Sequence, residues 1–125
     1  MKFVHTADWQ IGMKAAHVGA VGGRLREARL EAARKVIGVA ETQGAEFILL
    51  AGDTFEDNGV DRVLVQKLAD ILGKSAVPVY IIPGNHDPLV PGSVWDHPVW
   101  GEQEKIQVLE TPEPLEIPGG TLYPC

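Results

Sequence analysis

The sequence predicts an α/β protein in which parallel strands alternate with helices. Short apolar runs rich in β-branched residues occupy positions 2–7, 46–51 and 77–82. Such runs are typical of strands that are buried on both faces of a parallel sheet. The two segments between these runs repeat their apolar residues every three to four positions, as amphipathic helices do. The order is therefore β-α-β-α-β, and a length of 125 residues suits a single domain.

The first helix is expected over residues 24–43 and the second over residues 61–72. A glycine follows each periodic segment, Gly44 after the first and Gly73 after the second, and glycine is a common helix stop. The apolar stripe of the first helix consists of Leu25, Ala28, Ala32, Val36 and Ala40, and it is widened by Ala33 and Ile37. Further along, residues 106–109 predict a strand, and residues 115–123 a hairpin that would start a second sheet.

Polar residues follow each of the three predicted strands. Asp8 follows the first strand, Asp53 the second, and Asn85, His86 and Asp87 the third. Right-handed crossovers make the strands parallel, so their carboxyl ends meet at one edge, where ligand sites of such sheets form. Asn and Asp also favour plain turns, and that alternative stays open.

A cation is the expected neighbour of the two strand-end carboxylates. Two carboxylates about 5 Å apart repel by roughly 3 kcal/mol at an effective dielectric constant of about 20. A proton, a basic side chain or a metal ion must offset this repulsion. No Lys or Arg directly adjoins the three motifs, and oxygen donors beside an imidazole suit a divalent metal ion. The sequence therefore predicts a metal site.

Three motifs resemble those of a known family. His5-Thr6-Ala7-Asp8-Trp9, Gly52-Asp53-Thr54-Phe55 and Gly84-Asn85-His86-Asp87 are similar, in order and spacing, to the first three motifs of the calcineurin-like metallophosphoesterases. The opening motif further resembles the SbcD-type DNA-repair exonucleases, which work with an SMC-like ATPase. The resemblance covers roughly the first hundred residues. It implies that the chain is the N-terminal half of a β-sandwich flanked by helices.

The resemblance also implies a two-metal phosphodiester hydrolase that usually depends on Mn²⁺. Asp8 would bind one metal ion, Asp53 would bridge both, and Asn85 would bind the second. Gln10 stands where the family usually has a metal-binding histidine. An amide oxygen can bind a hard cation, but it is a poorer donor than imidazole towards manganese or zinc. Gln10 is therefore a fourth candidate ligand, and a weak one.

Two further residues receive roles in catalysis from the same resemblance. His86 would stabilise the transition state or protonate the leaving oxygen. Asp87 would act behind His86 and orient its ring, because such partners fix the tautomer and direction of an imidazole.

The chain is expected to be the N-terminal portion, residues 1–125, of one metallophosphoesterase domain. The family's second half supplies further His ligands, including a Gly-His-x-His pair. No such pattern follows residue 100 in this chain, which has four His in all. The predicted ligand set is therefore incomplete by comparison with the family.

Composition sets broader limits. With 45% hydrophobic and 22% charged residues, the chain has the composition of an ordinary globular protein. The single cysteine excludes an internal disulfide. No apolar run approaches the roughly 20 residues of a membrane span, and the N-terminus does not resemble a signal peptide. A cytoplasmic protein with no membrane contact is therefore expected.

The charge of −6 does not favour direct binding of DNA, because DNA-binding proteins usually cluster Lys and Arg. The densest basic cluster is interleaved with Glu27 and Glu31, which favours a solvated helix face. Its members are Arg24, Arg26, Arg29, Arg34 and Lys35.

Three functions remain open on the sequence. The first is an SbcD-type DNA nuclease with DNA and an SbcC-type ATPase as partners, either as a monomer or as a homodimer. The second is a phosphodiesterase for a small substrate, which the acidic charge accommodates more easily. The third is a catalytically silent module that binds a partner. Trp9, Trp95 and Trp100 could stack on bases, but roles in the core or in anchoring loops are favoured.

Overall fold

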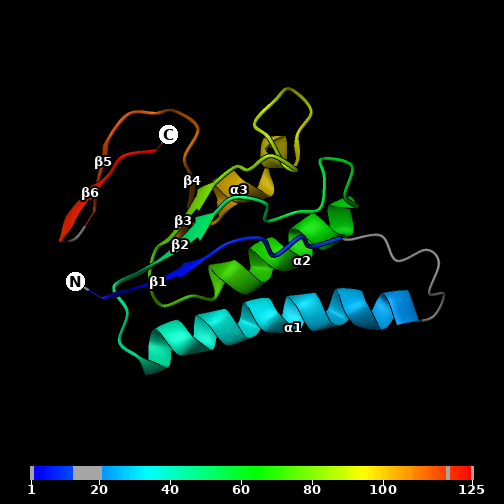
Figure 1. Cartoon of the computed structure of the whole chain (residues 1–125), viewed down its shortest axis with the longest axis horizontal. Coiled ribbons are helices and arrows are strands. Elements are labelled where there is room, and N and C mark those ends of the chain that lie inside the picture. Colours follow the sequence, from blue (N-terminus) through cyan, green and yellow to red (C-terminus); the bar gives the residue numbers. More distant parts are fainter. Residues whose placement is uncertain (1, 13–20, 118, 125) are drawn as a thin grey trace.

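A parallel sheet forms the centre of the molecule (Figure 1). The computed structural model describes residues 2–12, 21–117 and 119–124. Within these residues the sheet has four strands in the order β1-β2-β3-β4, so each strand pairs with its predecessor in the chain. The strands are β1 (Phe3–Thr6), β2 (Phe47–Ala51), β3 (Val79–Ile82) and β4 (Ile106–Val108). The predicted α/β class with parallel strands is confirmed.

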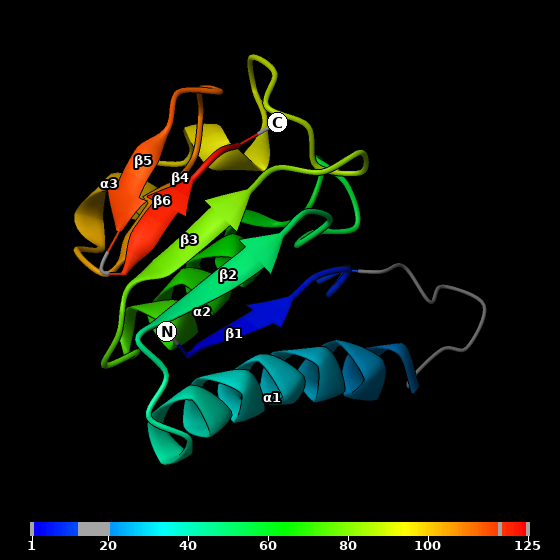
Figure 2. The same ribbon diagram turned by 60° about the vertical axis from the view of Figure 1, so that its left-hand side comes forward.

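The helices cover one face of the sheet. α1 (Val21–Thr42) and α2 (Arg62–Gly73) connect the first three strands, and both lie on the same side in Figures 1 and 2. Two short helices, η2 (Val94–Asp96) and α3 (Val99–Glu102), lie between β3 and β4. The main core joins side chains of all these helices to alternate residues of the central strands, such as Ile48, Leu50 and Ile81. Because strand residues alternate between faces, their neighbours point to the opposite side.

An antiparallel hairpin packs on that opposite side. β5 (Leu115–Ile117) pairs with β6 (Gly120–Leu122), as predicted. Ile117 joins Phe47, Tyr80 and Leu109 in a second apolar cluster between the hairpin and the sheet. Figure 2 shows the hairpin in front of the sheet and α2 behind it. Helices on one face and β-structure on the other agree with the expected half of a sandwich.

Both long helices lie where the periodicity predicts them. α1 spans Val21–Thr42 and α2 spans Arg62–Gly73, which differ from the predicted ranges by a few residues. The predicted stripe of α1 is partly wrong, because Ala28 and Ala32 are exposed, whereas the buried residues are Leu30, Ala33, Ile37 and Ala40. Asp61 precedes α2 and caps it, because its carboxylate accepts the Val63 N–H at 2.7 Å. Such a cap satisfies one of the N–H groups that a helix start leaves without an intrahelical partner.

The prediction that the first strand is fully buried is wrong. Phe3 is 45% exposed, and exposed and half-buried residues alternate along β1. In the part of the chain that the structure describes, β1 pairs only with β2 and forms an edge of the sheet. On the hairpin side, its Phe3 ring stacks on Phe47 with the ring centroids 4.8 Å apart.

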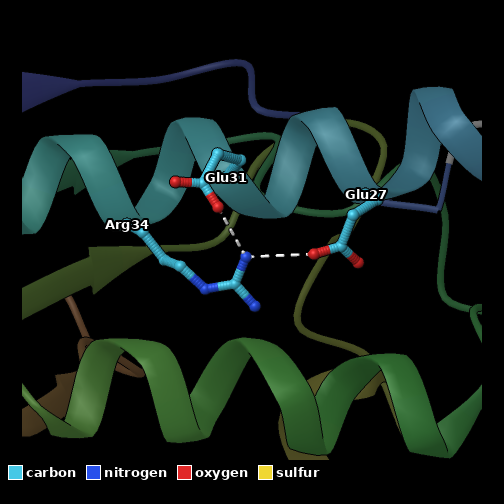
Figure 3. A network of polar contacts seen from close by, with 3 residues as sticks. All are labelled: Glu27, Glu31 and Arg34. Carbon is cyan, nitrogen blue, oxygen red and sulfur yellow. Dashed lines mark hydrogen bonds and ion pairs between the residues drawn. The ribbon is translucent and has the colours of Figure 1, made fainter.

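The charged residues of α1 are largely exposed, as predicted. Figure 3 shows three of them, Glu27, Glu31 and Arg34, in a network of polar contacts. The Arg34 guanidinium lies 3.0 Å from a Glu27 oxygen and 2.9 Å from a Glu31 oxygen, and all three side chains are exposed. Hydrogen bonds to the two carboxylates raise the Arg34 pKa further above its usual range. Exposed ion pairs contribute little to stability. None of the helices in the described ranges is both long and apolar enough to cross a bilayer.

Candidate metal centre

The segments that follow β1 and β2 run side by side at the carboxyl edge of the sheet. The N–H groups of Asp8 and Gln10 donate to the carbonyl oxygens of Gly52 (3.1 Å) and Asp53 (3.0 Å). Ile11 continues the pairing with a 2.9 Å bond to the carbonyl of Thr54. The backbones of the first two predicted carboxylate positions therefore meet, as the strand order requires.

The turn after β3 closes onto the same place. The His86 N–H donates to Asp53 Oδ1 at 2.8 Å, and His86 Nδ1 lies 3.9 Å from Asp53 Oδ2. Gly84 permits this approach, because a Cβ built there would overlap the backbone N and Oδ1 of Asp53. Asp53 thus links the second and third motifs, and one of its oxygens is already engaged by backbone.

Three of the four predicted metal ligands have a left-handed backbone. The φ angles are 57° at Asp8, 48° at Gln10 and 51° at Asp53. Few residues other than glycine adopt this region; Asp is enriched there, whereas Gln is not. Such conformations cost roughly 1–3 kcal/mol each and cluster at functional sites. The hydrogen bonds between the segments after β1 and β2 hold these residues in this conformation. They offset its conformational cost and keep the three residues at the carboxyl edge of the sheet.

The remaining predicted ligand, Asn85, lies in the third turn next to His86. Its side chain is exposed, and so is that of Asp8, whereas Gln10 and Asp53 are half-buried. Two carboxylates and two amide oxygens are hard donors of the kind that divalent cations such as Mn²⁺ and Mg²⁺ accept. In the described residues, no three His, Cys, Asp or Glu side chains cluster closely enough to hold a metal ion. The four predicted donors are two carboxylates and two amides, which are oxygen donors of the kind that a hard cation takes, and their grouping around a metal ion stays a prediction.

Asp87 has a different position from the one predicted. It is completely buried, and its two carboxylate oxygens accept the N–H groups of Gly84 (2.7 Å) and Phe55 (2.9 Å). Burial raises the pKa of Asp87, and these N–H bonds oppose the rise. The carboxylate near the His86 ring is that of Asp53. Asp87 therefore links the turn after β3 to the loop after β2. It does not orient the imidazole directly, because backbone N–H groups bind both of its carboxylate oxygens.

The contribution of Arg29 cannot be predicted from the sequence. Its Nη1 donates to the carbonyl of Trp9 at 2.8 Å, in the turn between Asp8 and Gln10. The Trp9 indole in turn donates to the Thr6 hydroxyl at 2.7 Å. The sequence predicts that Arg29 lies on a solvated helix face, because helical periodicity cannot show that a long side chain extends to a loop.

Comparison with known proteins identifies the class. Residues 1–121 match the family model described as calcineurin-like phosphoesterase. The chain belongs to this family of metallophosphoesterases, as its three motifs suggested.

The chain is similar to two proteins in particular. It is 28% identical over 120 residues to the uncharacterized metallophosphoesterase YhaO of Bacillus subtilis (strain 168), a match that covers 90% of this chain and 29% of YhaO. The crystal structure of Pseudomonas putida nuclease MPE matches with a TM-score of 0.47 and 21% identity, over 91% of this chain and 50% of that one. The chain therefore spans less than a third of the length of this curated relative.

Proposed function

We propose that this chain provides part of the active site of a metal-dependent phosphodiester hydrolase of the SbcD type. The observation that carries the proposal is the contact between the second and third motifs. The His86 N–H binds Asp53 Oδ1, and the ring nitrogen Nδ1 lies 3.9 Å from the other oxygen. In this chain of the phosphoesterase family, the Asp53 carboxylate and the His86 imidazole therefore lie together at one edge of the sheet. The amide of Asn85 belongs to the residue next to His86.

Divalent cations would be held by Asp8, Asp53, Asn85 and Gln10, and we propose two ions, most simply Mn²⁺. When bound, such a pair stabilises charge on phosphate oxygens and lowers the pKa of water. The His86 side chain is 51% exposed. It can therefore reach a phosphate at this edge and donate a hydrogen bond or a proton to the leaving oxygen.

The proposal of DNA as substrate rests on the opening motif, residues 5–9, which resembles the SbcD type. The chain's formal charge of −6 means that contacts to DNA phosphates would come from the longer protein or from an SMC-like ATPase partner. The same charge favours a small diester as the second candidate substrate. Rates on a small diester and on the ends of duplex DNA separate the two candidates.

The test is hydrolysis of bis(4-nitrophenyl) phosphate and of linear DNA, with Mn²⁺, by the longer protein expected to contain this chain. The His86→Ala variant should lose about 10²- to 10⁴-fold in kcat, the usual contribution of a proton-transferring group. Asp53→Ala should lose both activity and Mn²⁺ binding.

His97→Ala is the matched control. Its ring nitrogen accepts the Val99 N–H at 3.1 Å in a separate turn, so activity should stay near that of the wild type. Activity that survives both Asp53→Ala and His86→Ala would overturn the proposed function.

A further inference from the structure

We propose that Trp95 is a positioning residue of this site, which holds the turn formed by residues 84–87 against the loop after β2. The inference rests on the proposed function, because that turn contains Asn85 and His86, two residues of the proposed site. Trp95 lies outside the three motifs, in η2, eight residues beyond Asp87.

The Trp95 indole binds the turn through its backbone. Trp95 is only 4% exposed, and its Nε1–H donates to the carbonyl oxygen of Asp87 at 2.7 Å. The Ser93 hydroxyl accepts the Trp95 backbone N–H at 3.3 Å and fixes the start of η2. A buried carbonyl oxygen that loses its hydrogen-bond donor carries the full free-energy cost of its desolvation. This bond therefore stabilises the position of the turn in which the Asp87 carbonyl meets the Trp95 indole.

The Trp95 ring also packs on the loop that the turn must meet. The Phe55 ring lies edge-on to it, with the ring centroids 5.5 Å apart. The backbone N–H of Phe55 donates to Asp87 Oδ2. Trp95, Phe55 and Asp87 therefore form a closed set of contacts, in which each touches the other two.

This set of contacts reaches the proposed metal ligands in one further step. The other oxygen of Asp87 accepts the Gly84 N–H, and Gly84 lies directly against Asp53. Asn58 makes a second link between the loop after β2 and the segment that follows the turn. Its side-chain amide donates to the Pro88 carbonyl at 3.2 Å, and its Oδ1 accepts the Val94 N–H at 3.3 Å. Movement of Trp95 would therefore shift the turn relative to Asp53.

Trp100 offers a matched comparison inside the same aromatic cluster. It is 6% exposed, and its ring centroid lies 5.2 Å from that of Trp95. Its Nε1–H donates at 2.9 Å to the carbonyl of Val94, which lies outside the turn of residues 84–87. Replacing either tryptophan with phenylalanine removes one buried indole bond and keeps an aromatic ring, but only one of these bonds supports the turn.

The experiment measures amide hydrogen exchange by NMR in the metal-free 125-residue chain and in the two variants. Trp95→Phe should speed exchange at Gly84, Phe55 and His86 by about tenfold more than Trp100→Phe does, since loss of one buried bond opens the structure locally. Equal effects of the two variants at these amides would overturn the inference. If Trp95→Phe does not fold, the wild-type protein still decides. The Trp95 indole N–H should then exchange at the same rate as the Gly84 and Phe55 amides, and unrelated rates would overturn the inference.

Mn²⁺ titration of the same samples tests the proposed function separately. Trp95→Phe should weaken Mn²⁺ binding by about 10- to 100-fold, the usual effect of losing a residue that supports metal ligands, and Trp100→Phe should not. Absence of Mn²⁺ binding in the longer protein expected to contain this chain, together with the selective exchange effect, would remove the metal proposal and leave the role of Trp95 in the turn intact.

Discussion

Backbone conformation at single residues determines how the candidate site is presented. Asp8, Gln10 and Asp53 each occupy the left-handed region. Asp adopts the left-handed conformation more readily than most residues other than glycine, whereas Gln does not. The strand-end positions of these residues could be predicted from the sequence. Their conformations could not, because they depend on hydrogen bonds between segments about 45 residues apart, such as Gln10 to Asp53.

Gly84 gives a direct test at this scale. A methyl group in the Gly84→Ala variant would overlap the Asp53 backbone, which cannot move aside as a flexible side chain could. We expect a loss of about 1–3 kcal/mol in the free energy of unfolding, the usual cost of overpacking, together with weaker Mn²⁺ binding. Urea denaturation and metal titration measure the two effects.

Gly38→Ala is the control for that substitution. Gly38 lies within α1, and apart from its chain neighbours and the helix's own backbone, no heavy atom of the described residues lies within 4 Å of the added methyl group. Alanine in a helix interior should stabilise the protein by about 0.5–1 kcal/mol. A Gly84→Ala variant as stable as the wild type would show that the two loops are not closely apposed.

Among the elements, periodicity predicts the extents of both long helices and of the central strands. It misplaces part of the buried stripe of α1, because Ala28 and Ala32 lie on the exposed side of the helix. It failed to show that β1 is an edge strand, since Phe3 and Val4 are as apolar as residues of the central strands. The inward direction of Asp87 was equally hidden, because Asp is common in turns whichever way its side chain points.

The start of α2 gives the prediction at this scale. Asp61→Ala removes the acceptor of the Val63 N–H and should lower the free energy of unfolding by about 1 kcal/mol, whereas Asp61→Asn should keep most of the stability. Asp70→Ala removes the exposed 2.9 Å contact with Gln66 inside the same helix. It should leave the stability nearly unchanged, because the pair is worth only about 0.2–0.5 kcal/mol and alanine favours a helix interior more than aspartate does. Thermal and urea unfolding measure both. Equal losses for Asp61→Ala and Asp70→Ala would contradict a capping role.

For the whole molecule, binding of a cation to the native state must appear as stability. At a free Mn²⁺ concentration 100-fold above the dissociation constant, the free energy of unfolding should rise by about 2.7 kcal/mol. Chelation with EDTA should reverse the gain, and Asp53→Ala should abolish it. NaCl at matched ionic strength controls for screening of the chain's formal charge of −6. A gain that persists in Asp53→Ala would place the cation elsewhere.

The strand order has a consequence for the way the protein is made. Because β1, β2, β3 and β4 are neighbours in the same order as in the chain, each strand emerging from the ribosome can add to the one synthesised before it. Each parallel pair still spans a helical connection, and parallel pairing over such separations is intrinsically slow. The last turn of the candidate site, residues 84–87, is translated after β3 and before β4, so three strands of the sheet are synthesised before the site is complete.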